Sequence, residues 1–290
     1  MKSDNVAIQF GNPNVPFLAD YILHSARRKL PLVRHNMRRD AMGAVICGSG
    51  PSLLTDETLA FLREKEQTPG WLIFACKESI RMLREEQGIR VDYSVSMDPG
   101  ANQTAKTYRD KLITYCLASS CNPVLYDWLL DYGCKVMVFH SACGVVNEVG
   151  LYKGLFGCGD TVVGGFTVVN RAVGVANYMG IPNLVLCGTD FGWREGSDYY
   201  AKGATGKHLV DVTMNDAGQV DGKTWWSRPD LLASAVSIAH LIKRGKLTVL
   251  GDSLANSLAK RDDEYLARVA AIKNISPLMT APPKPPAEPA

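Results

Sequence analysis

Seven short apolar runs, separated by segments of helical pattern, constrain the fold of this chain more than any other feature. The runs cover residues 43–48, 71–76, 92–97, 112–118, 134–139, 183–188 and 246–250. Most are continuously apolar, which is typical of parallel strands covered on both faces. Helical patterns lie between them, near residues 56–66, 77–87, 123–132, 166–179 and 230–244. The sequence therefore predicts an α/β fold, doubly wound, with a mostly parallel sheet and helices on both faces.

Three parts of different composition flank and include this pattern. Residues 1–40 carry seven Lys and Arg against three Asp, a net charge of +4. The whole chain has a net charge of +3, so the remaining 250 residues sum to −1. We expect 1–40 to be a basic helical N-terminal extension, 41–275 the main domain, and 276–290 a proline-rich disordered tail. The basic cluster could attract nucleic acid or a phosphorylated substrate, or form a solvated helix face.

The expected compartment is cytoplasmic. No apolar run reaches the length of about 18 residues that a membrane span needs, and the first residues lack the pattern of a secretory signal. The eight cysteines include no C-x-x-C pair, and Cys47, Cys76, Cys116 and Cys187 lie in or beside strand-like runs. We therefore expect reduced core cysteines rather than a disulfide frame or a metal site.

A glycine turn directly follows the first apolar run, with the sequence Gly48-Ser49-Gly50-Pro51-Ser52-Leu53. A strand that enters such a turn and then a helix leaves backbone N–H groups that favour a phosphate. Leu53 stands where the dinucleotide fingerprint has its third glycine, so an ordinary NAD site is not expected. The alternative is a tight turn that binds nothing.

Two carboxylates follow predicted strands and are candidate catalytic residues. Asp98 and Asp190 each end a strand-like run, and we expect them at adjacent strand ends, where they could contact ribose, Mg²⁺ or an acceptor hydroxyl. The alternative for Asp98 is a cap of the following segment through an Asx turn. Lys77 and Glu78 follow another strand, where Lys77 could bind phosphate and Glu78 a hydroxyl or the helix dipole.

Two glycine-rich or long loops complete the predicted site. Residues 140–165 contain seven glycines and are expected to form a loop. Gly164 and Gly165 at its end, with Thr167, open a predicted helix and offer a second place for phosphate. Residues 188–230 resemble a lid. Its candidates for acid catalysis or charge neutralisation are Tyr199, Tyr200, Lys202, Lys207 and His208. His140 could face the cleft or be structural, and Trp225 and Trp226 could stack on a base or anchor the lid.

Taken in order, these motifs resemble a known superfamily, the MptE-like proteins and the motif-accessory (Maf) flagellin glycosylation proteins, with a more distant likeness to bacterial CMP-sialic-acid sialyltransferases. The motifs lie at residues 45–53, 74–77, 88–93, 98–99, 164–167, 180–191 and 199–201. The resemblance implies a Rossmann-like nucleotide-binding transferase.

The branches of that superfamily divide between two chemistries. The resemblance favours a glycosyltransferase that moves a sugar from a CMP- or UDP-linked donor to a hydroxyl acceptor. One alternative is a 6-hydroxymethylpterin-type pyrophosphokinase that uses ATP and Mg²⁺, with Asp98 and Asp190 as metal ligands. In place of that branch's closely spaced acidic pair, this chain has Asp98 before Pro99. A third alternative is a non-catalytic binding protein that kept the fold.

Overall fold

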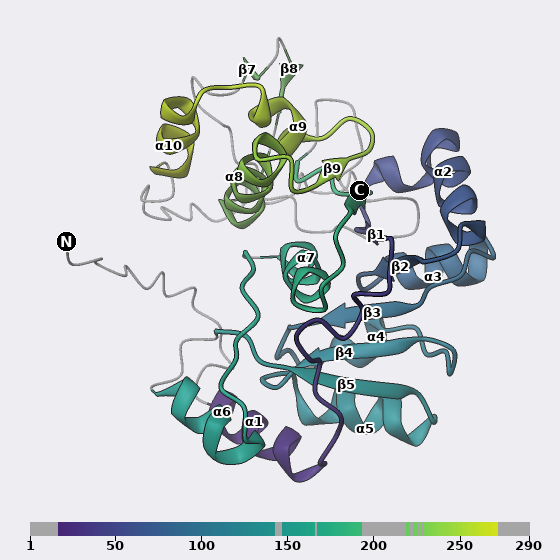
Figure 1. Cartoon of the computed structure of the whole chain (residues 1–290), viewed down its shortest axis with the longest axis vertical. Helices are drawn as coiled ribbons and strands as arrows, with labels where there is room; N and C mark the ends of the chain where they lie inside the picture. Colours follow the sequence, from purple (N-terminus) through teal and green to yellow (C-terminus); the bar gives the residue numbers. More distant parts are fainter. Residues whose placement is uncertain are drawn as a thin grey trace, which may run out of the picture.

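The computed structural model contains a seven-stranded parallel sheet in the order β5-β4-β3-β2-β1-β6-β9 (Figure 1). It describes residues 17–142, 147–165, 167–192, 219–220, 223–225, 227 and 229–271. The sheet strands are β1 Gly43–Cys47, β2 Trp71–Ala75, β3 Tyr93–Ser96, β4 Thr114–Ala118, β5 Lys135–Phe139, β6 Leu184–Cys187 and β9 Thr248–Val249. Each falls in a predicted run, and the predicted Rossmann-like α/β fold is confirmed.

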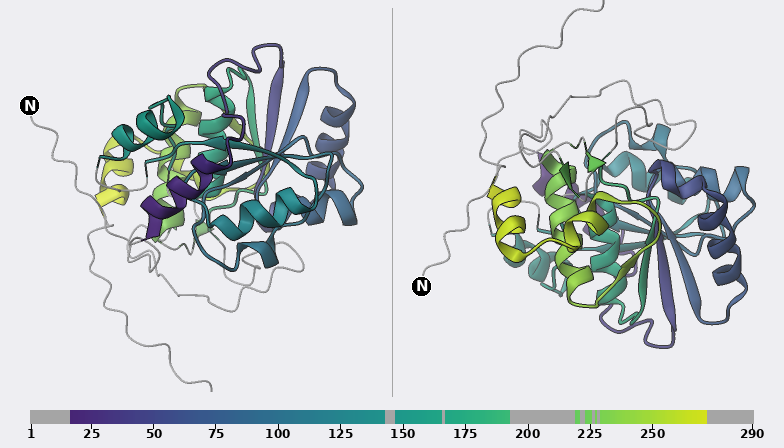
Figure 2. Two further views of the ribbon diagram at one scale, coloured as in Figure 1. Left: turned by 90° about the horizontal axis from the view of Figure 1, so that it is seen from below. Right: turned by 90° about the horizontal axis from the view of Figure 1, so that it is seen from above.

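The core lies on both sides of the central strands. All five residues of β1 are buried, and Ile46, Phe74 and Val95 are fully buried in three neighbouring strands. Figure 2 shows helices on both faces of the sheet, so each strand needs apolar side chains in both directions. This double burial explains why the runs in the sequence are continuous rather than alternating.

The predicted helices are present with shifted ends. They are α2 Asp56–Gln67, α3 Ser79–Arg81 with the π-helix η3 Met82–Glu86, α5 Pro123–Asp131, α7 Val168–Tyr178 and α8 Pro229–Lys243. Thr55, Asn122 and Thr167 cap three of them by accepting a hydrogen bond from a first-turn amide. Gly88 and Gly180 follow two helices with φ of +65° and +84°, the left-handed backbone that glycine adopts without steric cost.

Several further elements do not coincide with the predicted helices and strands. They are the 3₁₀ helix η2 Pro51–Leu54, α4 Gln103–Lys106, α6 Glu148–Phe156, α9 Leu254–Ala259, α10 Asp263–Ala271 and the antiparallel pair β7 Gln219–Val220 and β8 Lys223–Thr224. The prediction of a loop over residues 140–165 is wrong for α6. Gly150 and Gly154 interrupt its helical pattern, but Tyr152 is fully buried and anchors the helix by packing.

The basic N-terminal region packs against the sheet domain. Its helix α1 Leu18–Arg27 lies beside α5 and α6 and buries Leu18 and Ile22. Further along, the Val33 amide donates to the Val138 carbonyl oxygen at 2.8 Å, which attaches this segment to the outer edge of β5. Arg28 forms an ion pair with Asp127. The division at residue 40 stays a prediction, but part of the basic cluster has a structural role.

The cysteines in the described residues form no disulfide. Cys47, Cys76, Cys116, Cys121, Cys134 and Cys187 are buried and free, and Cys158 is free and half-buried. Burial raises the pKa of Cys76, Cys116 and Cys187 to about 12, so these thiols stay protonated. Among the described helices, none combines the length and apolar character that crossing a membrane requires.

Two helical glycines give a stability test of this packing. A Cβ on Gly174 of α7 would overlap the Val163 carbonyl oxygen, whereas a Cβ on Gly154 of α6 would meet nothing within 4 Å. Alanine is better than glycine in a helix by about 1 kcal/mol. We therefore expect Gly154→Ala to raise the free energy of unfolding and Gly174→Ala to lower it by about 1–3 kcal/mol. Urea denaturation followed by circular dichroism measures both, and two changes of the same sign would contradict the described packing of residue 163 on α7.

Candidate functional site

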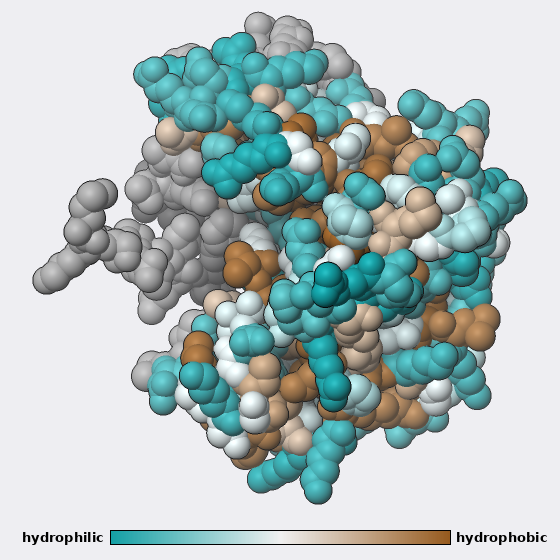
Figure 3. Space-filling model, in the orientation of Figure 1, coloured by the Kyte–Doolittle hydropathy of each residue, from teal (hydrophilic) through white to brown (hydrophobic). Residues whose placement is uncertain are grey.

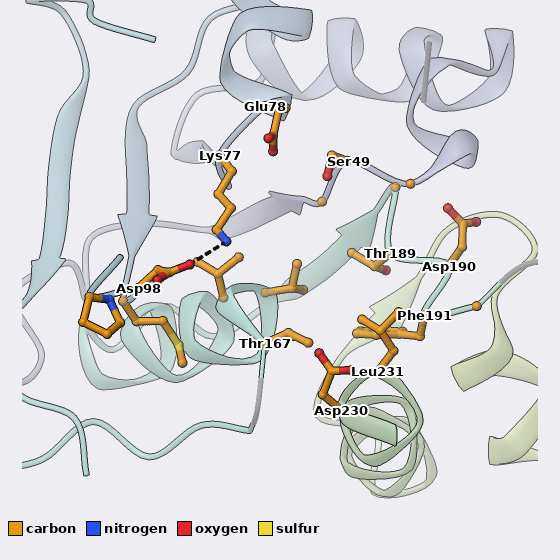
Figure 4. Close-up of a pocket in the computed structure, with 18 residues that line it drawn as sticks. Ser49, Lys77, Glu78, Asp98, Thr167, Thr189, Asp190, Phe191, Asp230 and Leu231 are labelled. Carbon is orange, nitrogen blue, oxygen red and sulfur yellow. Dashed lines mark hydrogen bonds and ion pairs between the residues drawn. The ribbon is translucent and has the colours of Figure 1, made fainter. Parts of the chain in front are cut away.

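A cleft of about 440 Å³ lies at the carboxyl ends of β1, β2, β3 and β6 (Figure 4). The strand order reverses between β1 and β6, because β2 to β5 extend from one side of β1 and β6 and β9 lie on the other. Ligands of open α/β sheets bind at this kind of position. The cleft walls include predicted residues from the glycine turn, Lys77, Asp98, Thr167 and Asp190, and residues that were not predicted, Thr189, Phe191, Asp230 and Leu231.

The protein itself uses most backbone amides of the glycine turn. The Gly48 and Gly50 amides donate to the carbonyl oxygens of Cys187 and Gly188, each at 2.8 Å. The Ser52 amide donates to Asp190 Oδ2 at 3.3 Å, the Leu53 amide bonds back within the turn, and Pro51 has no N–H. Among the amides of the turn, this leaves that of Ser49 without a hydrogen bond to another described residue. The geometry therefore supports the alternative that the turn is structural, although Gly48, Ser49 and Gly50 do line the cleft.

Asp190 acts as the internal anion at this turn. Its side chain is 9% exposed, and a Cβ on Gly50 would overlap Asp190 Oδ2. Asp190 follows β6 and Asp98 follows β3, with β2 and β1 between these strands. The expectation of adjacent strand ends is thus wrong. Three strand spacings separate the backbones of Asp98 and Asp190 by about 14 Å. Because Mg²⁺ binds its oxygen ligands at about 2.1 Å, the two carboxylates cannot share one ion from these positions.

Lys77 and Asp98 form an ion pair on the opposite flank of the cleft. Lys77 Nζ lies 3.4 Å from Asp98 Oδ2, and the two side chains are 30% and 37% exposed. Asp98 also accepts hydrogen bonds from the Gly100 amide at 2.8 Å and from Gln103 Nε2 at 3.0 Å. The predicted Asx cap at Asp98 is therefore present. Lys77 has a φ of +55°, a left-handed backbone that costs a residue with a Cβ about 1–2 kcal/mol.

The N-terminus of α7 opens into the cleft. Thr167 caps it, because its Oγ1 accepts from the Asn170 amide at 3.4 Å and donates to Asn170 Oδ1 at 2.6 Å. Thr167, Val168 and Val169 line the cleft, so the positive end of this 11-residue helix faces it.

Gly164 and Gly165, in contrast, are not among the residues that line the cleft. A Cβ on Gly164 would lie 3.0 Å from Arg171 Cα, and one on Gly165 would lie 2.6 Å from Asn170 Nδ2. These glycines allow the chain to pass close to α7, which does not require a phosphate. The binding role predicted for them has no support in the described geometry.

Several predicted residues lie elsewhere or outside the described chain. Tyr199, Tyr200, Lys202, Lys207, His208 and Trp226 are outside the described residues, and their lid and catalytic roles stay predictions. Trp225 is buried. Glu78 lines the cleft beside Lys77.

His140 has the structural role that was one of its two predicted alternatives. It is 3% exposed, its Nδ1 lies 3.2 Å from Ser119 Oγ, and its ring stacks on Tyr152 with centroids 4.3 Å apart. It does not line the cleft.

The burial of His140 predicts a pH dependence of stability. Desolvation lowers the pKa of His140 to about 4, so the native state holds a neutral imidazole that the unfolded chain protonates near pH 6.5. The contribution of the neutral imidazole to the free energy of unfolding is complete above pH 6.5 and is lost as the pH falls towards 4. We expect the free energy of unfolding to drop by about 2 kcal/mol between pH 7 and pH 5 from this group. Urea titrations should show a smaller drop for His140→Asn, and an equal drop would contradict the assignment.

A double-variant cycle tests the contact between Asp190 and the glycine turn. Gly50→Ala should lower the free energy of unfolding by about 1–3 kcal/mol, because the new methyl group overlaps the carboxylate. In the Asp190→Ala background the same change should cost less, since the carboxylate is gone. Thermal and urea unfolding of the four proteins measure the coupling. Strict additivity would show that Asp190 does not occupy the turn.

Comparisons with known proteins agree with this architecture. The structure resembles that of the MAf glycosyltransferase from Magnetospirillum magneticum AMB-1, with a TM-score of 0.57 and 17% identity over 88% of this chain and 42% of that one. This chain thus spans less than half the length of that neighbour. A weaker match, with a TM-score of 0.37 and 12% identity over 74% of this chain and 84% of the other, is the Campylobacter jejuni sialyltransferase CstII in complex with a substrate analogue.

No curated protein matches the sequence. A family model, in contrast, matches residues 21–196, which is more than half of the chain and contains six of the seven sheet strands, β1 to β6. On this match, the chain belongs to the family described as 6-hydroxymethylpterin diphosphokinase MptE-like.

Proposed function

We propose that this protein is a nucleotide-dependent transferase that moves a glycosyl group from a nucleotide-activated sugar, CMP- or UDP-linked, to a hydroxyl acceptor. The observation that carries the proposal is the convergence of the Lys77 ammonium group and the N-terminus of α7 on one cleft at the strand-order reversal. Both favour a negatively charged group, and the cleft volume falls within the range of small-molecule sites, about 300–1,000 Å³.

In this proposal, catalysis depends on positioning and charge neutralisation. The leaving nucleotide gains negative charge as the bond to the sugar breaks, and Lys77 and the first-turn amides of α7 stabilise it. Asp98 lies within the same ion pair, where its carboxylate can accept a hydrogen bond from an acceptor hydroxyl. The catalytic role of His208 and the substrate contacts of Tyr199, Tyr200 and Lys202 belong to the proposal as predictions from sequence.

The alternative reaction is diphosphate transfer from ATP, which the family description favours. That chemistry uses Mg²⁺ to bridge the phosphates. Asp98 and Asp190 lie on opposite flanks of the cleft, three strand spacings apart at their backbones. This separation disfavours one Mg²⁺ held by both carboxylates, and the resemblance in fold to a MAf glycosyltransferase supports sugar transfer.

Nucleotide binding by a Lys77 variant tests the proposal. We expect the wild-type protein to bind CMP or UDP without Mg²⁺, and Lys77→Met to weaken this binding about 10- to 100-fold, the usual effect of losing a charge-assisted hydrogen bond. Lys106→Met, which removes an exposed lysine outside the cleft, is the matched control. Isothermal calorimetry measures affinity, and chromatography of CMP- and UDP-sugar reactions detects the released nucleotide.

The same calorimetry with ATP, with and without Mg²⁺, separates the candidate functions. Binding of ATP only in the presence of Mg²⁺ would favour the diphosphokinase. A protein that binds none of these nucleotides would contradict both transferase functions and favour a non-catalytic role. Equal affinities of the Lys77 variant and wild type would leave the reaction class open but remove Lys77 from the phosphate site.

A further inference from the structure

The outer face of α5 exposes a stripe of apolar and aromatic side chains. Helix α5 packs on β5 and lies beside α1 (Figure 2). Val124, Trp128 and Tyr132 are spaced four residues apart, and Tyr132, the C-cap residue, keeps helical backbone angles. The three side chains therefore follow one another along one side of the helix. They are 55%, 37% and 42% exposed, and contiguous exposed apolar side chains mark contact surfaces, whereas scattered ones do not.

Two cations lie over the aromatic part of this stripe. The guanidinium carbon of Arg109 is 3.5 Å from the ring centre of Trp128 and 4.5 Å from that of Tyr132. Lys111 Nζ is 5.4 Å from the Tyr132 ring centre. Neither cation has a carboxylate partner among the residues that the structure describes. Tryptophan, tyrosine and arginine are the side chains that contribute most of the binding energy in protein–protein interfaces.

An acidic edge lies on the other side of the stripe. At about 100° per residue, Asp131 lies about 20° to one side of Val124. Trp128 and Tyr132 lie about 40° and 80° to the other side. Asp131 is exposed and has no ion-pair partner in the described part of the chain, whereas Asp127 on the same edge is already paired. The face is therefore acidic along one edge, apolar in the middle and basic along the other edge.

This distribution makes the face complementary to a second copy of itself. A two-fold axis that runs along α5, in the plane of contact, turns each edge of one copy onto the opposite edge of the other. The Asp131 carboxylate of one copy then meets Arg109 and Lys111 of the other copy. The same contact occurs twice, because a two-fold interface is isologous.

We propose that a second copy of this chain covers the outer face of α5, in a symmetric dimer whose two-fold axis runs along that helix. In the dimer, the apolar stripe of one copy packs on the stripe of the other and is removed from water, and each Asp131 gains a cationic partner. The inference does not depend on the proposed function, because none of these residues lines the cleft.

The mass of the full chain in solution is the first test. The chain has a mass of 31.6 kDa, and sedimentation velocity at micromolar concentration should show a species of twice that mass. Trp128→Ala should weaken the dimer about 10-fold or more, the usual effect at the centre of an interface. A wild-type protein that stays monomeric over the micromolar range overturns the proposal. A dimer of unchanged affinity in Trp128→Ala also overturns it, because the contact would then lie elsewhere.

Charge reversal tests how the two copies meet, and it uses exposed residues, so that the fold is kept. Asp131→Lys places like charges across the contact, and Lys111→Asp replaces a cationic partner by an anion, so each variant should dimerise more weakly than wild type. Mixed in equal amounts, the two variants regain opposite charges and should form a heterodimer that is tighter than either homodimer. A mixture that associates no better than the separate variants overturns the proposal. Circular dichroism checks the fold of each variant.

Lys246→Asp is the matched control for Lys111→Asp. It reverses the same charge on an exposed lysine beside β9, which is the opposite edge strand of the sheet from β5. Its dimer should be as tight as that of wild type. An equal weakening by Lys246→Asp and Lys111→Asp would show an effect of net charge and would overturn the assignment to α5.

Discussion

The close approach of β1 and β6 at their carboxyl ends determines the geometry of the whole cleft. The strands are in parallel register up to Cys47 and Cys187, and each continues into a glycine, Gly48 and Gly188. A Cβ on Gly48 would overlap the Gly188 carbonyl oxygen, and one on Gly188 would lie 2.6 Å from Leu53 Cβ. Only residues without side chains permit this contact, and it places Thr189 and Asp190 beside the glycine turn.

Figure 3 shows the exterior of the fold, where hydrophilic and hydrophobic residues are interspersed on the visible face.

Asp190 decides which of the two predicted phosphate positions remains available. The Asp190 carboxylate at the glycine turn accepts from the Ser52 amide, and backbone carbonyl oxygens accept from the amides of Gly48 and Gly50, so most N–H groups that a phosphate could use are already bonded within the protein. A ligand phosphate at the turn would face this carboxylate at close range, and two like charges repel in a partly desolvated site. On the other flank of the cleft, Lys77 is paired with the partly exposed Asp98, and the N-terminus of α7 opens into the cleft.

The sequence was sufficient for the seven sheet strands and for five of the helices, but not for α6 or for the order of the strands in space. Continuous apolar runs located all seven sheet strands, and Gly88 and Gly180 located two helix ends, because these signals are local. The separation of Asp98 from Asp190 depends on the order of the strands in the sheet. The apolar runs that precede these two residues do not encode that order. In the same way, Gly164 and Gly165 had the composition of a phosphate loop, and only their contacts with α7 show a packing role.

Two of the five described non-glycine residues with a left-handed backbone line the cleft. Lys77 and Phe191 both have left-handed backbones, with φ of +55° and +57°, and they lie on opposite flanks. Each conformation costs about 1–3 kcal/mol and persists only because neighbouring contacts enforce it. For Phe191, one such contact is its carbonyl oxygen, which accepts a hydrogen bond from the buried Ser227 hydroxyl at 2.7 Å. A fold that served only as a scaffold would gain stability by replacing these residues with glycine or asparagine. Both strained residues lie at strand ends that line the cleft, so the tight turns after β2 and β6 shape its two flanks.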